Sequence, residues 1–276
     1  MKKWYAVIGD PIGQSMSPAM HDTWFNENHI DASYIPVHVT KEDLEAAVES
    51  LKRLGCSGWN VTVPHKSAII PMLDSIDESA KMMNAVNTVK VLEDGTLFGM
   101  NTDGRGFVRS LAEMFGIDAE SGDVLIIGAG GAARGISFAL KESGYGPLTF
   151  TNRTVAKAQT LSEDFLDSNA LSLEQAEKKL GAFNLIVQTT TVGMNYAESG
   201  MALSPDLLSS GSIVADIIYN PLETEFLKEA GKLGGKTMNG LGMFVHQGAL
   251  AFELWTGIYP DTEKMIRSIS TKLGGN

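Results

Sequence analysis

The segment VLIIGAGGAARG, residues 124–135, restricts the fold of this chain more than any other part of the sequence. Its apolar run predicts a short buried strand, its glycines predict a tight turn, and the residues that follow predict a helix. The run PLTFTNR at residues 147–153 then predicts a second strand. Strand, helix and strand in this order form a βαβ unit, so the chain is expected to be an α/β protein.

The glycine-rich turn also matches the dinucleotide-binding fingerprint G-x-G-x-x-G/A at Gly128, Gly130 and Ala133. The first glycine permits the tight turn, the second lets backbone amides approach a pyrophosphate, and the small third residue lets helix and strand pack closely. The helix N-terminus adds partial positive charge. A purely structural turn is the alternative. The predicted cofactor-binding turn comprises Gly128, Ala129, Gly130, Gly131, Ala132 and Ala133.

The end of the next strand is expected to select the cofactor. An acidic residue there would hydrogen-bond the ribose 2′-hydroxyl of NAD, but the sequence has Asn152, Arg153 and Thr154. A guanidinium beside hydroxyl and amide groups suits a 2′-phosphate, so NADP is predicted. Arg134 is a candidate second clamp, and a solvated loop arginine is the alternative for Arg153.

Strand and helix patterns also alternate before the nucleotide unit, which favours parallel pairing of the first strands. Asp94-Gly95 predicts a hairpin, and apolar runs after the unit predict further strands in its sheet. Leu44, Val48, Leu51 and Leu54 lie at helical spacing, with a capping box from Thr40 to Asp43 and a stop at Gly55. The predicted strands cover 4–10, 34–39, 58–63, 183–190 and 212–218, and the predicted helices cover 17–29, 40–55 and 106–116.

Composition excludes several classes of partner. A formal net charge of −11 over 276 residues disfavours a nucleic-acid surface, which needs clustered Lys and Arg. One cysteine, Cys56, excludes an internal disulfide and a Cys-rich metal site, and no metal is predicted because His21, His65 and His246 lack ligand spacing. No apolar run is long enough for a signal segment or membrane span, so a cytoplasmic protein is expected.

Several polar residues outside the nucleotide unit suggest a substrate site. In NVTVPHK, residues 60–66, Asn60 and Thr62 alternate with Val61 and Val63, which are expected to pack behind them. An edge strand with one wet face is the alternative. Lys66 ends the segment, and an ammonium group there can stabilise negative charge that develops on a substrate and supply a proton. A solvated lysine is the alternative.

Two further pairs accompany this segment. Ser15 and Ser17 lie two residues apart beside a predicted helix N-terminus, which attracts an anion. Ser17 as a simple N-cap, before Pro18, is the alternative. Asn87 and Asp103 bracket the predicted hairpin, which brings them together, and Asp103 as a helix cap is the alternative.

These stretches, GQSMSPAMH, NVTVPHK, NAVNT with GMNTDGRG, GAGGAAR, NRT and NGLGMFVHQGALAFELWTG, occur in the order found in shikimate dehydrogenases, and together they resemble that family over essentially the whole chain. The resemblance implies reduction of 3-dehydroshikimate to shikimate with NADPH. It also implies two α/β domains with the site in the cleft between them: residues 1–103 plus 240–276 as the substrate-binding domain with a mainly parallel sheet, and residues 104–239 as a Rossmann-like NADP-binding domain.

The resemblance also implies residue roles. Lys66 and Asp103 would form the catalytic pair. Substrate would be bound by Ser15, Ser17, Asn60, Thr62, Lys66, Asn87, Asp103, Tyr219 and Gln247. Cofactor would be bound, besides the glycine-rich turn, by Asn152, Arg153, Thr154, Thr189, Thr190, Ile217, Gly240 and Met243. Thr191 and Phe244 depart from the family pattern, which commonly has proline and leucine there.

Two other functions are compatible with the motifs. One is a quinate/shikimate dehydrogenase that uses NAD or both cofactors, although that variant favours an acidic residue near Arg153. The other is a non-catalytic NADP-binding sensor, which would not need to keep Lys66 and Asp103. The expected partners are a small-molecule substrate, with no nucleic acid and no membrane, and the chain is expected to be a monomer or homodimer.

Overall fold

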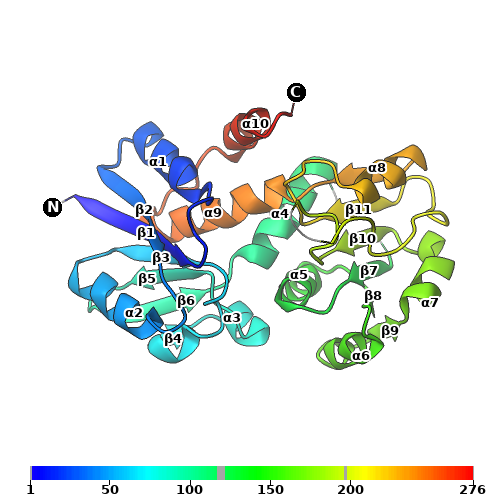
Figure 1. The fold of residues 1–276 in the computed structure, drawn as a ribbon, viewed down its shortest axis with the longest axis horizontal. Helices are drawn as coiled ribbons and strands as arrows, with labels where there is room; N and C mark the ends of the chain where they lie inside the picture. The colour runs from blue at the N-terminus through cyan, green and yellow to red at the C-terminus, as the bar shows by residue number, and fades with distance from the viewer. Residues whose placement is uncertain (1, 117–121, 196–197, 276) are drawn as a thin grey trace. The chain divides into compact units, whose positions relative to one another are not determined.

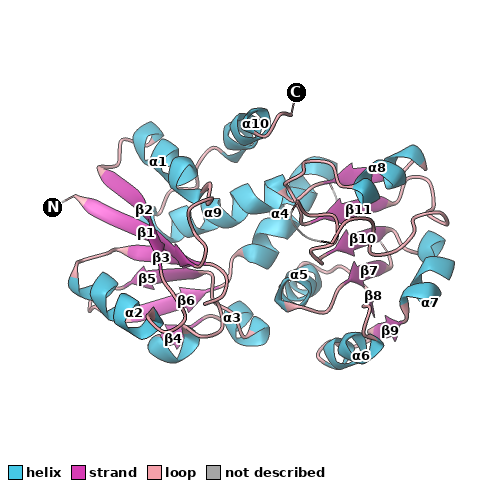
Figure 2. Ribbon diagram, viewed as in Figure 1, coloured by secondary structure: helices cyan, strands magenta, loops and turns pink. Residues whose placement is uncertain are grey.

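A computed structural model describes residues 2–116, 122–195 and 198–275. The chain divides into two compact units. The first comprises Met1–Asp103 with Gln247–Met265, and the second comprises Gly104–His246 with Ile266–Asn276. Figure 1 follows the chain through its elements, and Figure 2 shows that each unit combines a sheet with helices. The α/β fold class predicted from the sequence is therefore confirmed.

The first unit contains a six-stranded sheet in the order β2-β1-β3-β5-β6-β4. β1 pairs in parallel with both β2 and β3, which confirms the predicted parallel arrangement. β5 and β6 pair antiparallel as the Asp94-Gly95 hairpin predicts, with Asp94 Oδ1 accepting hydrogen bonds from the backbone and hydroxyl of Thr96. The strands are β1 (Lys3–Gly9), β2 (Ala32–His38), β3 (Gly58–Val61), β4 (Ser75–Ile76), β5 (Thr88–Val91) and β6 (Leu97–Met100).

Amphipathic helices accompany this sheet: α1 (Ser17–Glu27), α2 (Leu44–Arg53) and α3 (Glu78–Met83). Leu44, Val48 and Leu51 of α2 are buried, as their spacing predicts. Leu54 lies past the helix end and is exposed, so the prediction that it shares the apolar face of the helix is wrong. The predicted capping box is also wrong, because the Thr40 hydroxyl donates to the Asp43 carboxylate, 2.7 Å away, and Asp43 caps no backbone amide.

Aromatic rings form much of the first unit's interior. Tyr5 stacks on Phe25 and on Trp255, the latter at 4.8 Å between ring centroids. Trp255 belongs to α9 (Leu241–Thr256), and its indole N–H donates to the carbonyl of Val89 in β5, 2.9 Å away. A side chain at position 58 would collide with the Trp255 ring, so this position requires glycine. The ring contacts thus hold α9 against the sheet.

The second unit contains a six-stranded parallel sheet in the order β12-β11-β10-β7-β8-β9. Its strands are β7 (Val124–Ile127), β8 (Leu148–Thr151), β9 (Asn169–Leu171), β10 (Leu185–Gln188), β11 (Ile213–Asp216) and β12 (Lys236–Met238). Its helices are α4 (Asp103–Phe115), α5 (Gly131–Glu142), α6 (Val155–Glu163), α7 (Leu173–Lys178), α8 (Glu225–Lys232) and α10 (Thr262–Lys272), although α4 and α10 each begin in residues of the first unit.

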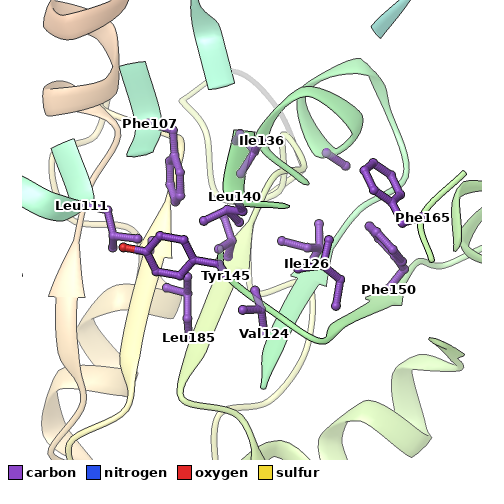
Figure 3. Close-up of a cluster of buried hydrophobic side chains, with 14 of the residues drawn as sticks. Phe107, Leu111, Val124, Ile126, Ile136, Leu140, Tyr145, Phe150, Phe165 and Leu185 are labelled. Carbon is purple, nitrogen blue, oxygen red and sulfur yellow. The ribbon is translucent and has the colours of Figure 1, made fainter. Parts of the chain in front are cut away.

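The core of the second unit joins β7 to the helix that follows it (Figure 3). Val124 and Ile126 of β7 lie with Ile136 and Leu140 of α5, and all four side chains are almost completely buried. Full burial of such a side chain stabilises the folded state by roughly 1.5–3 kcal/mol relative to leaving it exposed. The packed strand and helix hold the glycine-rich turn between them in a defined position.

The two units differ from the expected domains in segments 240–246 and 266–276, which belong to the second unit. Gly242 packs directly on Ser110 of α4, and His246 Nε2 lies 2.9 Å from Glu113 Oε2 of the same helix. Near the C-terminus, Gly275 approaches Leu222. Along the described ranges, no helix has both the length and the apolarity that a membrane crossing requires.

Candidate active site

The centre of the site in the first unit is an ion pair. Lys66 Nζ lies 2.6 Å from Asp103 Oδ2, and the two side chains are 31% and 17% exposed. The backbone carbonyl of Lys66 accepts a hydrogen bond from Val86 N at 2.7 Å, which holds the lysine's main chain. Asp103 is the first residue of α4, where the helix dipole favours a carboxylate. The ammonium is thus held in place and still open to a small molecule.

Asn87 completes the support of that carboxylate. Its Nδ2 donates to Asp103 Oδ1 at 2.9 Å, so each carboxylate oxygen has its own donor. Asn87 Oδ1 in turn accepts hydrogen bonds from the backbone N–H and the hydroxyl of Thr102. The structure therefore brings Asn87 and Asp103 together, as the hairpin predicts.

Asn60 and Thr62 lie at the end of β3, but the strand is shorter than expected. It ends at Val61, and the backbone N–H of Thr62 donates to Ile8 O of β1 at 3.0 Å. Val61 is buried as predicted, whereas Val63 is 68% exposed, so the prediction that both valines pack behind the polar pair is wrong. The regular alternation of a strand does not continue past Val61.

The two serines lie at the start of α1. The helix begins at Ser17, and Met16 occupies the N-cap position, so Ser17 does not have the N-cap position of the alternative interpretation. Ser17 N lies 3.3 Å from Ser15 Oγ, and Ser17 itself is almost buried. The loop before them is joined to the end of β3 because Asp10 N donates to Val63 O at 3.0 Å.

Gln247 is a half-buried residue of α9. The next residue, Gly248, packs against Met20 of α1, so α9 approaches α1 closely here. Tyr219 belongs to the second unit, where its ring stacks on Phe244 with centroids 4.9 Å apart. The departure from the family pattern at Phe244 thus supplies a partner for the predicted substrate residue, and burial raises the pKa of Tyr219.

The glycine-rich turn of the second unit has room for a ligand. Gly128 has φ +119° and packs on Thr189 and Thr190, so a side chain there would be strained and would collide. At Gly130 and Gly131 a Cβ would meet no atom within 4 Å, so the N-terminus of α5 is open. Ala133 is completely buried. This arrangement fits a pyrophosphate on the exposed amides of α5.

Positive charge lies beside this turn. A hollow of about 270 Å³ is lined by Ala129, Arg134, Ala156, Lys157, Thr160 and Leu161. Arg134 already forms an ion pair with Asp164, whereas Arg153 is 83% exposed and lies 3.3 Å from Glu198. Asn152 Nδ2 donates to Thr154 O. Sequence reasoning missed Lys157, although its place in the first turn of α6, four residues after Arg153, was a usable signal.

Two loops at the carboxyl ends of β10 and β11 are joined by a buried carboxyl group. Asp216 Oδ1 accepts from Ile218 N at 3.0 Å, and Oδ2 accepts from the Thr224 hydroxyl at 2.8 Å. Gln188 Nε2 lies 3.4 Å from Asp216 Oδ1 and also donates to the carbonyls of Thr190 and Val192. Burial raises the pKa of Asp216 to about 6.

The remaining predicted cofactor residues follow these loops. Gly240 N donates to Ile218 O at 2.8 Å, and the backbone of Ile217 occupies the space that a Cβ on Gly240 would need. Met243 and Ile217 both pack against the core of the second unit. These positions show why only glycine fits at residue 240.

The buried histidines have structural surroundings. Burial lowers the pKa of His21 to about 3, and His65 Nε2 lies 2.7 Å from Val39 O. Within residues 2–116, 122–195 and 198–275, no group of three or more His, Cys, Asp or Glu side chains has a metal-binding arrangement.

A parallel sheet with an open glycine turn, and an α/β unit with a supported lysine–aspartate pair, define the class of dinucleotide-dependent α/β dehydrogenases. Family models agree in detail: residues 7–89 match the shikimate dehydrogenase substrate binding domain, residues 110–204 match shikimate / quinate 5-dehydrogenase, and residues 240–269 match the shikimate 5′-dehydrogenase C-terminal domain. The chain belongs to the shikimate dehydrogenase family, as its motifs predict.

Individual relatives cover the whole chain. The shikimate dehydrogenase (NADP(+)) of Lysinibacillus sphaericus is 55% identical over 276 residues, which is 100% of both chains. A crystal structure of a shikimate dehydrogenase with NADP+ has a TM-score of 0.91 at 37% identity, covering 99% of this chain and 96% of that one. The Thermus thermophilus enzyme with NADP(H) and shikimate has a TM-score of 0.87 at 38% identity, covering 96% and 98%.

Proposed function

We propose that the protein catalyses the reversible reduction of 3-dehydroshikimate to shikimate with NADPH. The observation that carries this proposal is the lysine–aspartate pair, 2.6 Å between Lys66 Nζ and Asp103 Oδ2, held by Asn87 beside the end of β3. A relative that is 55% identical over its full length and bears the name of this activity supports it.

NADPH, when bound, supplies the hydride that forms the new C–H bond. As the carbonyl π electrons move to oxygen, the Lys66 ammonium stabilises the negative charge and donates its proton to that oxygen. The neutral amine then takes a proton from solvent. Asp103 orients the ammonium and accepts from a substrate hydroxyl, and Asn87 keeps the carboxylate in place.

The substrate carboxylate is proposed to bind Ser15 and Ser17, where the N-terminus of the 11-residue helix α1 also favours an anion. Tyr219 is proposed to contact the same carboxylate. The ring hydroxyls are proposed to contact Asn60, Thr62, Asn87, Asp103 and Gln247. Of these, Asn60 retains only acceptor capacity, since both of its N–H groups are used within the protein.

For the cofactor, the proposal assigns the pyrophosphate to the turn from Gly128 to Ala133, whose open glycines fit it. The 2′-phosphate is assigned to Arg153 and Lys157, because the Arg153 side chain is 83% exposed and its ion pair with Glu198 lies at the surface, whereas the Arg134 side chain is only 30% exposed in its pair with Asp164. Asn152 and Thr154 flank that phosphate. The nicotinamide end is assigned to Thr189, Thr190, Ile217, Gly240 and Met243.

One observation favours a different substrate. The family model over residues 110–204 bears the names of both shikimate and quinate dehydrogenases, so quinate is the competing substrate. The test is to follow nicotinamide reduction with shikimate and with quinate, each combined with NADP and with NAD. Fastest turnover with shikimate and NADP is expected. Preference for quinate with NAD would favour the alternative, and no turnover with any pair would favour a sensor.

The oligomeric state and the cellular location of the protein are part of the proposal. We propose a monomer or homodimer in the cytoplasm, where a reducing environment suits a chain whose single cysteine, Cys56, is a buried free thiol. Sedimentation of the purified protein would measure the oligomeric state.

A further inference from the structure

A buried tyrosine from outside every sequence motif contacts the site. Tyr34 lies in β2, is 3% exposed, and its hydroxyl is 2.6 Å from Asn60 Oδ1. β1 lies between β2 and β3 in the sheet, so the contact reaches past one strand. The two residues are 26 positions apart in sequence.

The direction of this hydrogen bond follows from the groups around Asn60. Asn60 Nδ2 lies 3.1 Å from the backbone carbonyl of Asn87, which can only accept. The amide nitrogen must therefore face that carbonyl, and the amide oxygen must face Tyr34. Because Asn60 Oδ1 can only accept, the Tyr34 hydroxyl is the donor. The carbonyl of Asn87 thus defines the orientation of the Asn60 amide.

The donors and acceptors of the next hydrogen bonds, between Asn60 and the ion pair, are defined as well. Asn60 Nδ2 also donates to Thr88 Oγ1 at 3.1 Å, which leaves the Thr88 proton to donate to Asn87 Oδ1 at 2.9 Å. With its oxygen engaged there, Asn87 presents its N–H groups to Asp103 Oδ1 and Thr102 Oγ1. Asp103 Oδ2 then accepts from Lys66. A continuous chain of hydrogen bonds, buried from Tyr34 to Asn87 and part-buried at the ion pair, leads from Tyr34 to the lysine.

The Tyr34 ring is itself held by other rings. His21 of α1 stacks on it with centroids 4.4 Å apart and an interplanar angle of 5°, and Trp255 lies 6.2 Å away. Burial keeps His21 uncharged, with a pKa of about 3. Burial is the main cause that raises the pKa of Tyr34 well above its usual value, and the nearby Asp22 carboxylate adds to it, so the Tyr34 hydroxyl keeps the proton that it donates.

We propose that Tyr34 is a positioning residue for the reaction, whose hydroxyl orients Asn60 and, through Asn87, the Lys66–Asp103 pair. This inference rests on the catalytic pair assigned under the proposed function. It also makes orientation of Asn87 the main role of Asn60. An apolar ring of the same shape would leave Asn60 Oδ1 without its donor inside a buried network, where such a loss is costly.

The test uses Tyr34→Phe with Tyr5→Phe as its matched control. Tyr5 is the register partner of Tyr34 on β1, is 1% exposed, belongs to the same ring cluster, and has Ser57 rather than Asn60 beside its hydroxyl. For Tyr34→Phe, kcat is expected to fall roughly 3- to 30-fold, the range for a lost buried hydrogen bond, while the KM for NADP stays unchanged. Tyr5→Phe should change thermal stability but keep kcat within about twofold.

A double-mutant cycle separates positioning from general destabilisation. In an Asn60→Ala background, or Asn60→Leu if the alanine variant folds poorly, Tyr34→Phe should change kcat less than twofold, because the link is already broken. The same fold-loss in both backgrounds, or equal kcat values for Tyr34→Phe and Tyr5→Phe, would overturn the positioning role alone. A folded wild-type protein without shikimate and NADP turnover would overturn both this inference and the proposed function.

Discussion

Replacing Asp216 by asparagine should change how the free energy of unfolding depends on pH. The carboxyl group is completely buried, and its hydrogen-bond donors are the backbone of Ile218, the Thr224 hydroxyl and the Gln188 amide. All three donors are uncharged. An asparagine has the same shape and keeps an acceptor toward Ile218 N, so the substitution removes the titration with little change in packing.

The magnitude follows from the pKa of about 6 in the folded protein, against a usual value of 3.8. Between those values the folded state holds a proton that the unfolded state has released. This group therefore stabilises the fold fully below its unfolded pKa, and the stabilisation is lost as pH rises through the folded pKa. A difference of about two pH units corresponds to roughly 3 kcal/mol.

The assay is urea unfolding of the wild-type and Asp216→Asn proteins at several pH values between about 4 and about 8. The four tryptophans, Trp4, Trp24, Trp59 and Trp255, all belong to the first unit, so circular dichroism is needed to report on the second. Wild-type stability relative to the variant should decrease by roughly 2–3 kcal/mol as pH rises across this range. A difference that does not change with pH would refute the reasoning.

Three other substitutions test the catalytic lysine, the cofactor contact and the close packing at residue 240 separately. Lys66→Ala should lower turnover by roughly 10²- to 10⁴-fold with NADP affinity nearly intact, as steady-state kinetics and cofactor titration would measure, and near-normal turnover would remove the lysine from the mechanism. Arg153→Ala should raise the KM for NADP roughly tenfold or more without a matching effect on NAD, and equal effects would argue against a 2′-phosphate contact. Gly240→Ala should destabilise the protein by roughly 3 kcal/mol, because the Cβ would collide with the backbone of Ile217, and an unchanged melting temperature would contradict that contact.

Local sequence patterns were sufficient for the elements with strong periodicity. The apolar run and glycines around Gly128 identified β7 and α5, and Asp94-Gly95 identified the β5–β6 hairpin. Short strands such as β4, Ser75–Ile76, and β12, Lys236–Met238, were not predicted, because two or three residues cannot establish an alternation. Their pairing is tertiary: Ser75 and Ile76 pair with Phe98 and Gly99 of β6.

The end of β3 shows how a correct pattern can be extended too far. Alternation in residues 60–63 predicted that Val61 and Val63 would both be buried, yet the strand ends at Val61 and Val63 faces solvent. The backbone carbonyl of Val63 instead accepts from Asp10 N of the loop before Ser15. A contact between segments more than fifty residues apart has no signature in a local pattern.

Some site residues could be identified from the sequence, and others only from the fold. Family motifs and chemistry pointed to Lys66, Asp103 and Asn87, and the fold brings these three together. Tyr34 was not identified, because a tyrosine inside a strand is ordinary, and only the sheet order reveals that its hydroxyl reaches Asn60. Asp216 was missed for a related reason, since its burial depends on packing around β10 and β11.

If this chain directs hydride from NADPH to the ketone of 3-dehydroshikimate, with Lys66 as the proton donor, the hydride of NADPH must appear in the product. The most direct measurement uses NADPH deuterated at both positions of the nicotinamide carbon that gives the hydride, with mass spectrometry of the product. The expected product of the wild-type protein is shikimate that carries one deuterium, with almost none formed in the same time by Lys66→Ala. Absence of labelled shikimate from the wild-type protein, or equal labelling by both proteins, would contradict this mechanism.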